Sequence, residues 1–133
     1  MFLVDASVWV AAVMPQHPQY LQSKRLLEAG LPLTVLDLTL LEVANVVTRK
    51  YKQPEEARRL VQGLPLSSSE GPVRADVALL QLSVDLMIEH ELTAYDAAYV
   101  AAARANDWQL VSLDVRDLVS KGLAVTPDAA LYP

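Results

Sequence analysis

Phe2-Leu3-Val4-Asp5, directly after Met1, is a short apolar run of strand-forming residues that stops at an acid. Near the other end, Gln109-Leu110-Val111-Ser112 has the same character, and Asp114 follows it with one residue between. Ligands of open α/β sheets bind at the carboxyl ends of the strands. We therefore expect these two acids to lie at the sheet edge where such folds place their active sites.

Segments with a helical pattern alternate with strand-like segments along the chain. The clearest helix covers residues 39–51, with Leu40, Val43 and Val47 on its apolar face. Residues 7–13 are apolar throughout and fit either an extension of the first strand or a short helix. The alternation predicts an α/β fold with a mostly parallel sheet. Further helices are expected at residues 18–29, 55–62, 73–90, 95–106 and 115–120, further strands at residues 33–36, 64–66 and 123–125, and an irregular tail at residues 127–133.

The bulk properties predict one compact domain, residues 1–133, because this length and a 53% apolar content suit a single core. A net charge of −5 argues against a broad basic face that binds nucleic acid non-specifically. The absence of cysteine excludes disulfides, thiolate metal sites and cysteine catalysis. Residues 1–14 lack a basic leader, and no run reaches the roughly 18 apolar residues of a membrane span. We expect a cytoplasmic protein without a membrane partner.

Two more acids, Glu42 and Asp96, fall in the first turns of predicted helices. Taken singly, all four acids fit helix caps: Thr39 to Glu42 and Thr93 to Asp96 match capping boxes, and Asp5 and Asp114 match N-caps. A helix N-terminus also favours the ionised carboxylate that a metal requires. Carboxylate and water oxygens are the ligands that Mg²⁺ and Mn²⁺ prefer. The four acids together therefore predict a site for a hard divalent cation, which can promote phosphodiester cleavage.

Polar neighbours of these acids suggest supporting roles. Ser7 and Ser112 lie two residues from an acid, where a hydroxyl either orients a carboxylate or simply ends a strand. Asn45 and Arg49 follow Glu42 at successive helical turns, and this stripe either reaches a substrate phosphate or forms a solvated helix face. The same two interpretations apply to the basic cluster of residues 49–59. Other residues are expected to be structural. Asp117, Asp37 and Asp107 are expected to be solvated or capping acids, and His17 and His90 to have structural roles. Tyr95 and Tyr99 are expected to pack, with a hydroxyl near the site.

Four local patterns resemble those of PIN-domain nucleases, and more closely the short toxins of the VapC type. The resemblance runs along nearly the whole chain, and its most specific pattern is the third one. Ser112 stands where the family often has threonine, which keeps the hydroxyl. The patterns are Phe2-Leu3-Val4-Asp5-Ala6-Ser7, Glu42-Val43-Ala44-Asn45, Leu92-Thr93-Ala94-Tyr95-Asp96-Ala97-Ala98-Tyr99 and Leu110-Val111-Ser112-Leu113-Asp114.

The resemblance implies a three-layer α/β/α fold with four to five short, mostly parallel strands. It also implies an endoribonuclease that depends on Mg²⁺ or Mn²⁺, cuts RNA by metal-activated water, forms a homodimer and is inhibited by a cognate antitoxin. By motif position, Asp5, Glu42 and Asp96 match the three principal metal-binding acids of the family, and Asp114 matches a fourth with a more variable role. Asp117 competes with Asp114 for that place.

Three other functions remain open on the sequence: a binding module, a phosphatase and a receiver domain. A PIN-like module that only binds RNA or protein would not need the complete set of acids. A haloacid-dehalogenase-like phosphatase would carry a second aspartate where this chain has Ser7. A receiver domain would carry paired acids near its first strand and a lysine after a late one, whereas here no lysine follows Val111 until Lys121. The last two fit poorly.

Overall fold

The computed structural model describes residues 1–68 and 70–133. Its central sheet is small and parallel. Within these residues it has three strands in the order β2-β1-β3. Strand β1 (Phe2–Val4) lies between β2 (Leu33–Thr34) and β3 (Gln109–Val111) and pairs with both in parallel. The four to five strands expected from the resemblance therefore exceed those observed, and isolated bridges from Leu36 to Val73 and from Val111 to Val125 take the place of the others.

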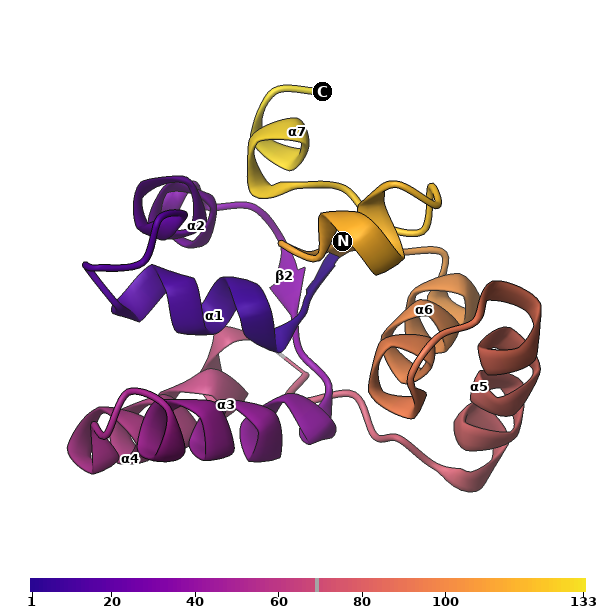
Figure 1. Cartoon of the computed structure of the whole chain (residues 1–133), viewed down its shortest axis with the longest axis horizontal. Coiled ribbons are helices and arrows are strands. Elements are labelled where there is room, and N and C mark those ends of the chain that lie inside the picture. Colours follow the sequence, from indigo (N-terminus) through magenta and orange to yellow (C-terminus); the bar gives the residue numbers. More distant parts are fainter. Residues whose placement is uncertain (69) are drawn as a thin grey trace.

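Helices account for most of the chain (Figure 1). Helices α3 and α4 pack side by side, as do α5 and α6, and the two pairs lie on opposite sides of the molecule. The helices are α1 (Ala6–Val13), α2 (Tyr20–Glu28), α3 (Asp37–Arg49), α4 (Pro54–Gly63), α5 (Val77–His90), α6 (Ala94–Asn106) and α7 (Pro127–Leu131), with a 3₁₀ helix at Leu64–Ser67 and a π-helical turn at Val115–Val119.

Two apolar cores sandwich the sheet, because successive strand side chains point to opposite faces. Leu3 and Leu110 pack with α5 and α6 on one face. Val4 and Val111 pack with α1, α2, α3 and α4 on the other. The expected α/β/α layering is therefore confirmed. The alanines of α6, five of which are buried, let this helix pack closely against its neighbours.

Several sequence-based expectations about local structure were wrong or had been left open. Residues 7–13 are helical, because the Asp5 carboxylate accepts from the backbone N–H groups of Ser7 and Val8 and caps α1. The stretch expected as a strand at residues 64–66 is a 3₁₀ helix, whose Pro65 has no N–H for a sheet ladder. At residues 123–125 only Val125 reaches the sheet.

The C-terminal tail is ordered rather than irregular over Pro127–Leu131, which form α7. Thr126 caps this helix by accepting from the Ala129 N–H, and Pro127 occupies the first helical position, where its missing N–H costs nothing. The helix packs on α2. None of the helices in the described part of the chain has the length and apolarity needed to cross a membrane.

Candidate metal centre

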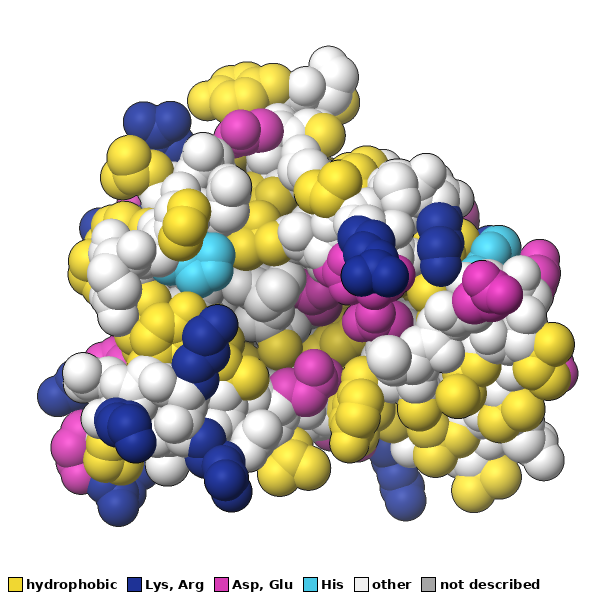
Figure 2. All heavy atoms as spheres, in the orientation of Figure 1, with side chains coloured by type: hydrophobic (Ala, Val, Ile, Leu, Met, Phe, Trp, Pro, Cys, Tyr) yellow, Lys and Arg dark blue, Asp and Glu magenta, His cyan; other side chains and the backbone are white. Residues whose placement is uncertain are grey.

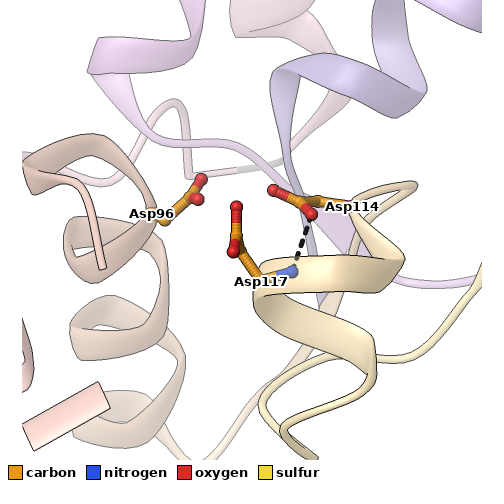
Figure 3. A group of neighbouring side chains, drawn as sticks. All are labelled: Asp96, Asp114 and Asp117. Carbon is orange, nitrogen blue, oxygen red and sulfur yellow. Dashed lines mark hydrogen bonds between the residues drawn. The ribbon is translucent and has the colours of Figure 1, made fainter. Parts of the chain in front are cut away.

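Three carboxylates converge at the C-terminal edge of the sheet (Figure 3). Asp96 comes from the first turn of α6, while Asp114 and Asp117 come from the π-helical turn after β3. One oxygen from each lies within 4.8 Å of the others. The Asp117 N–H donates to Asp114 Oδ1 at 2.9 Å, so the turn itself fixes the relative position of these two acids. An all-oxygen, half-buried set of this size fits a hard divalent cation.

Asp5 is buried at the end of β1, with 5% of its surface exposed. Its Oδ1 accepts from the backbone N–H and the hydroxyl of Ser7 and from the Val8 N–H. The Ser7 hydroxyl in turn accepts from the Leu113 N–H at 3.0 Å, and the Ser112 hydroxyl accepts from the Asp114 N–H at 3.0 Å. Ser7 therefore ties the end of β1 to the loop after β3, and Ser112 fixes the backbone of Asp114 within that loop. Each hydroxyl contacts an acid, as the sequence suggested.

Glu42 is held by a tyrosine from another helix. The Tyr99 hydroxyl donates to Glu42 Oε1 at 2.9 Å and lies 2.7 Å from Thr39 Oγ1. Tyr99 is 1% exposed and lies one helical turn after Asp96 on α6. This hydrogen bond joins α3 to α6 and holds Glu42 where the charges of Asp5 and Asp96 influence it, although Glu42 is not one of the three acids within 4.8 Å of one another. Packing of Tyr99 with its hydroxyl near the site is confirmed.

The expected capping box between Thr39 and Glu42 is wrong. Helix α3 begins at Asp37, two residues earlier than Thr39, and its first turn is bound differently. The Asp37 carboxylate accepts from the N–H groups of Leu38 and Ala75, which fixes the helix start against the segment before α5. With Thr39 inside the helix and facing Tyr99, Glu42 is free to turn toward the other acids.

The acids influence one another electrostatically. Burial raises the pKa of Glu42 to about 7, with the Tyr99 hydrogen bond opposing and the charges of Asp5 and Asp96 adding to the rise. Burial also raises the pKa of Asp96 to about 6, helped by Asp114, Asp5 and Asp117 and opposed by Lys121. For Asp5 burial again raises the pKa, while hydrogen bonds from Ser112, Ser7 and Val8 lower it. Acids that only cap helices do not need to lie close enough to repel one another. A bound cation would relieve the repulsion between these carboxylates.

Asp117 belongs to this group of three acids, although the sequence analysis expected it to be a solvated or capping residue. Asp114 caps the π-helical turn, since its Oδ1 accepts from the Asp117 N–H. The carboxylates of Asp114 and Asp117 nevertheless both lie next to that of Asp96 (Figure 3). Asn45 shares a cavity of about 460 Å³ with Glu42 and Tyr95, whereas Arg49 is exposed and is not among the described residues of that lining.

Replacing Tyr99 by Phe tests the link between α3 and α6. The change removes a hydroxyl buried between Thr39 and Glu42, so we expect a loss of about 1–2 kcal/mol in the free energy of unfolding. Glu42 would lose its orienting donor and its pKa would rise further, so Mn²⁺ affinity should fall by about 10- to 100-fold. Denaturant unfolding and calorimetry measure the two effects.

Tyr95→Phe is the matched control, because Tyr95 precedes Asp96 on the same helix and is 55% exposed. Its free energy of unfolding should stay within about 0.5 kcal/mol of wild type. Equal losses in the two variants would contradict the structural role assigned to the Tyr99 hydroxyl.

A group of acidic side chains lies in a hollow near the centre of the face shown in Figure 2. They lie between the side of the molecule formed by α3 and α4, over which basic side chains are grouped, and the side formed by α5 and α6. A sheet flanked by helices on both faces, with carboxylates converging at its C-terminal edge, defines an α/β protein with a candidate cation site at the usual ligand-binding edge.

The chain belongs to the PIN domain family, which it matches over residues 2–120. It is 32% identical to Ribonuclease VapC3 of Pyrobaculum aerophilum over 130 residues, which cover 94% of this chain and 98% of that protein. The toxin-antitoxin complex from Klebsiella pneumoniae has the same fold, with a TM-score of 0.73, 23% identity and coverage of 96% and 98% of the two chains. VapC20 of Mycobacterium tuberculosis, a toxin that cleaves the sarcin-ricin loop, has a TM-score of 0.77 at 19% identity, covering 92% and 95%.

Proposed function

We propose that this protein is a metal-dependent endoribonuclease and the toxin of a type II toxin–antitoxin system. The observation that carries the proposal is the convergence of Asp96, Asp114 and Asp117 within 4.8 Å, with Asp5 and Glu42 raising the local negative charge. The relative named as a ribonuclease, which aligns over nearly its whole length, supports RNA as the substrate. The acting unit would be one domain, residues 1–133, working in the cytoplasm.

The acids would hold Mg²⁺ or Mn²⁺. When bound, the cation supplies a Lewis acid that activates water and offsets charge developing on the scissile phosphate. Asp96 and Asp114 offer oxygens directly, with Asp117 beside them, and Asp5 and Glu42 complete the negative surface. Ser7 holds Asp5, Ser112 holds the backbone of Asp114, and Tyr99 holds Glu42. Tyr99 stays protonated because burial raises its pKa, so it remains a donor at every relevant pH.

Cleavage of a structured RNA pool by the purified chain tests the function. With Mg²⁺ or Mn²⁺ we expect discrete cleavage products, and with EDTA none. Cleavage that persists in EDTA would contradict metal dependence. The alternative, a PIN-like module that binds RNA or protein without cutting, predicts no cleavage and no Mn²⁺ binding by calorimetry, and the intact and mutually repelling acids argue against it.

An antitoxin partner is part of the proposal. The solved relatives include a toxin-antitoxin complex from Klebsiella pneumoniae, which shares the fold. We expect the cognate antitoxin to cover the acidic hollow, because occupying this edge of the sheet would keep RNA away from the carboxylates (Figure 2). A basic side chain of the antitoxin would suit the uncompensated acids.

A homodimer would use the outer face of α5, over which apolar side chains gather in Figure 2. A stripe at helical spacing is exposed there although it is entirely aliphatic. Such a face is self-complementary about a two-fold axis. The stripe consists of Val77, Leu80, Val84 and Ile88, which are 72%, 45%, 53% and 77% exposed.

The double variant V84E/I88E should convert the dimer to a monomer, because two carboxylates would be buried against apolar surface. We expect the dimer dissociation constant to rise more than about a hundredfold, equivalent to about 3 kcal/mol. Size-exclusion chromatography with light scattering measures the mass. Leu21→Glu on α2, where Leu21 is 59% exposed, is the control and should remain dimeric. A monomeric wild type at about 100 μM would contradict the interface.

A further inference from the structure

A groove next to the acids carries a different kind of side chain. It has a volume of about 480 Å³ and includes Glu42 and Asp114 in its lining, so it is continuous with the candidate metal centre. Away from these acids it is lined by His17, Lys50 and Tyr51. A space of this size is within the range of small-ligand sites and accommodates a nucleotide.

Helix α3 sets the distance between the two parts of the groove. Glu42, Val46 and Lys50 all line it and follow one another at intervals of four residues, which places them on one helix face. At 1.5 Å per residue, Lys50 lies about 12 Å along the axis from Glu42. This separation along the helix suits a phosphate further along the RNA than the phosphate at the acids.

Lys50 is available for a phosphate. It is exposed, and none of the described carboxylates forms an ion pair with it, whereas Arg58 and Arg59 of the neighbouring helix pair with Glu55 and Glu56. Its ammonium lies 5.5 Å from the centre of the Tyr51 ring. The ring holds the lysine by a cation–π contact, and Tyr51 also lines the groove.

His17 has one ring nitrogen committed. Its Nδ1 accepts from the Gln19 N–H at 3.0 Å, so in the neutral ring Nε2 carries the proton. Burial and the nearby Lys50 charge both lower the pKa of His17, which keeps the ring neutral near pH 7. His17 lines the groove, a position that the purely structural role expected from the sequence does not account for.

The remaining lining suits a base or a ribose. Val10 and Val46 contribute apolar surface to the groove, beside Tyr51. Single-stranded RNA is recognised by such apolar and aromatic surfaces together with a cation for its backbone. The acids at one end repel the RNA backbone unless a cation intervenes, so the lysine end is where a phosphate is attracted directly.

We propose that this groove is a subsite for the nucleotide flanking the scissile phosphate, with Lys50 binding its phosphate, His17 Nε2 donating to it, and Tyr51, Val10 and Val46 contacting its base or ribose. The inference rests on the proposed ribonuclease function and adds to it the side of the centre on which the RNA continues. Arg49, the substrate contact suggested by the sequence, is adjacent to Lys50 in the chain but is not among the described residues that line the groove.

The test compares Lys50→Met, His17→Phe and the control Arg104→Met, which removes one positive charge at the far end of α6. The probe is an end-labelled pool of structured RNA hairpins. For Lys50→Met we expect KM to rise about tenfold with kcat within about twofold, the signature of lost uniform binding. His17→Phe should show a smaller rise in KM, and Arg104→Met none. Thermal unfolding confirms that each variant is folded.

RNA binding in the Asp96→Asn background separates this inference from the proposed function. Between about 50 and 200 mM salt, Lys50→Met should reduce the slope of log K against log salt by about 0.7, the value for one phosphate contact on a single strand. Wild-type cleavage with KM and salt slope unchanged by Lys50→Met would overturn the subsite. A changed slope without wild-type cleavage would uphold the subsite and contradict the nuclease function.

Discussion

Asp96→Asn should abolish metal-dependent RNA cleavage and leave the fold intact. Asp96 offers an oxygen to the group formed with Asp114 and Asp117, and an amide of the same shape removes the negative charge that a cation requires. Loss of a residue that merely orients a metal ligand costs about 10- to 100-fold, so loss of a ligand should exceed a hundredfold. Initial rates of RNA cleavage at saturating Mg²⁺ measure the effect.

The same substitution should stabilise the protein in EDTA. Neighbouring acids and burial both penalise the ionised Asp96, and Asn carries no charge. Because Asp96 is only half-buried, we expect a gain of about 1 kcal/mol at most, and the thermal midpoint should rise by a few degrees. The cap of α6 is retained, since Thr93 binds the backbone N–H of Asp96 rather than its side chain.

Asp5→Asn should also abolish cleavage, because it removes another of the negative charges at the candidate metal centre. The fold should remain intact, because Asn is also a good N-cap for α1. Asp107→Asn is the matched control at the other end of α6, where the residue adopts a left-handed conformation that Asn tolerates. Full cleavage activity of Asp96→Asn, or an equal loss of activity in Asp107→Asn, would contradict the assignment of the metal centre.

Metal affinity should rise steeply between pH 5.5 and pH 8. Burial first, and then the neighbouring acids, raise the pKa of Glu42 to about 7 and that of Asp96 to about 6 in the metal-free protein. A carboxylate must lose its proton to bind a cation, so protons compete with Mn²⁺ below these values. We expect the Mn²⁺ affinity to fall more than about tenfold from pH 8 to pH 5.5.

Calorimetry in two buffers of different ionisation enthalpy measures both affinity and proton release. We expect Mn²⁺ binding to release about one proton near pH 6.5 and almost none at pH 8.5, where both acids are already ionised. An affinity that does not change with pH would show that Glu42 and Asp96 are not ligands.

Stability without metal should have the opposite trend with pH. In the unfolded chain these acids titrate near their ordinary values of 4.5 and 3.8, below their folded values of about 7 and 6. The folded protein therefore holds more protons between about pH 4 and pH 7, and its stability falls as pH rises through this window. Since both groups are partly exposed, the loss should be about 1–2 kcal/mol. Thermal unfolding in EDTA at several pH values measures it.

Local sequence determined the type of most elements and the position of three acids. Strand β1 and strand β3 are short apolar runs, and Asp5, Asp114 and Thr93 cap the helical segments that follow because their side chains reach backbone N–H groups two or three residues away. Such contacts depend on nearby residues alone. Residues 64–66 and 123–125 were harder, since short apolar runs form strands only where a neighbouring strand is available to pair.

The tertiary structure alone decided which acids meet. The position of the Glu42 carboxylate depends on Tyr99, 57 residues later, which donates to it, and Thr39 binds the same hydroxyl instead of capping the helix. Asp117 lies beside Asp114 through a local contact, because its N–H donates to Asp114 Oδ1, and only folding brings Asp96 of α6 to these two acids. Lys50 and His17 share a groove only after α1 and α3 pack on one face of the sheet. Hydrogen bonds and packing between distant segments set these positions, and no local pattern of residues specifies them.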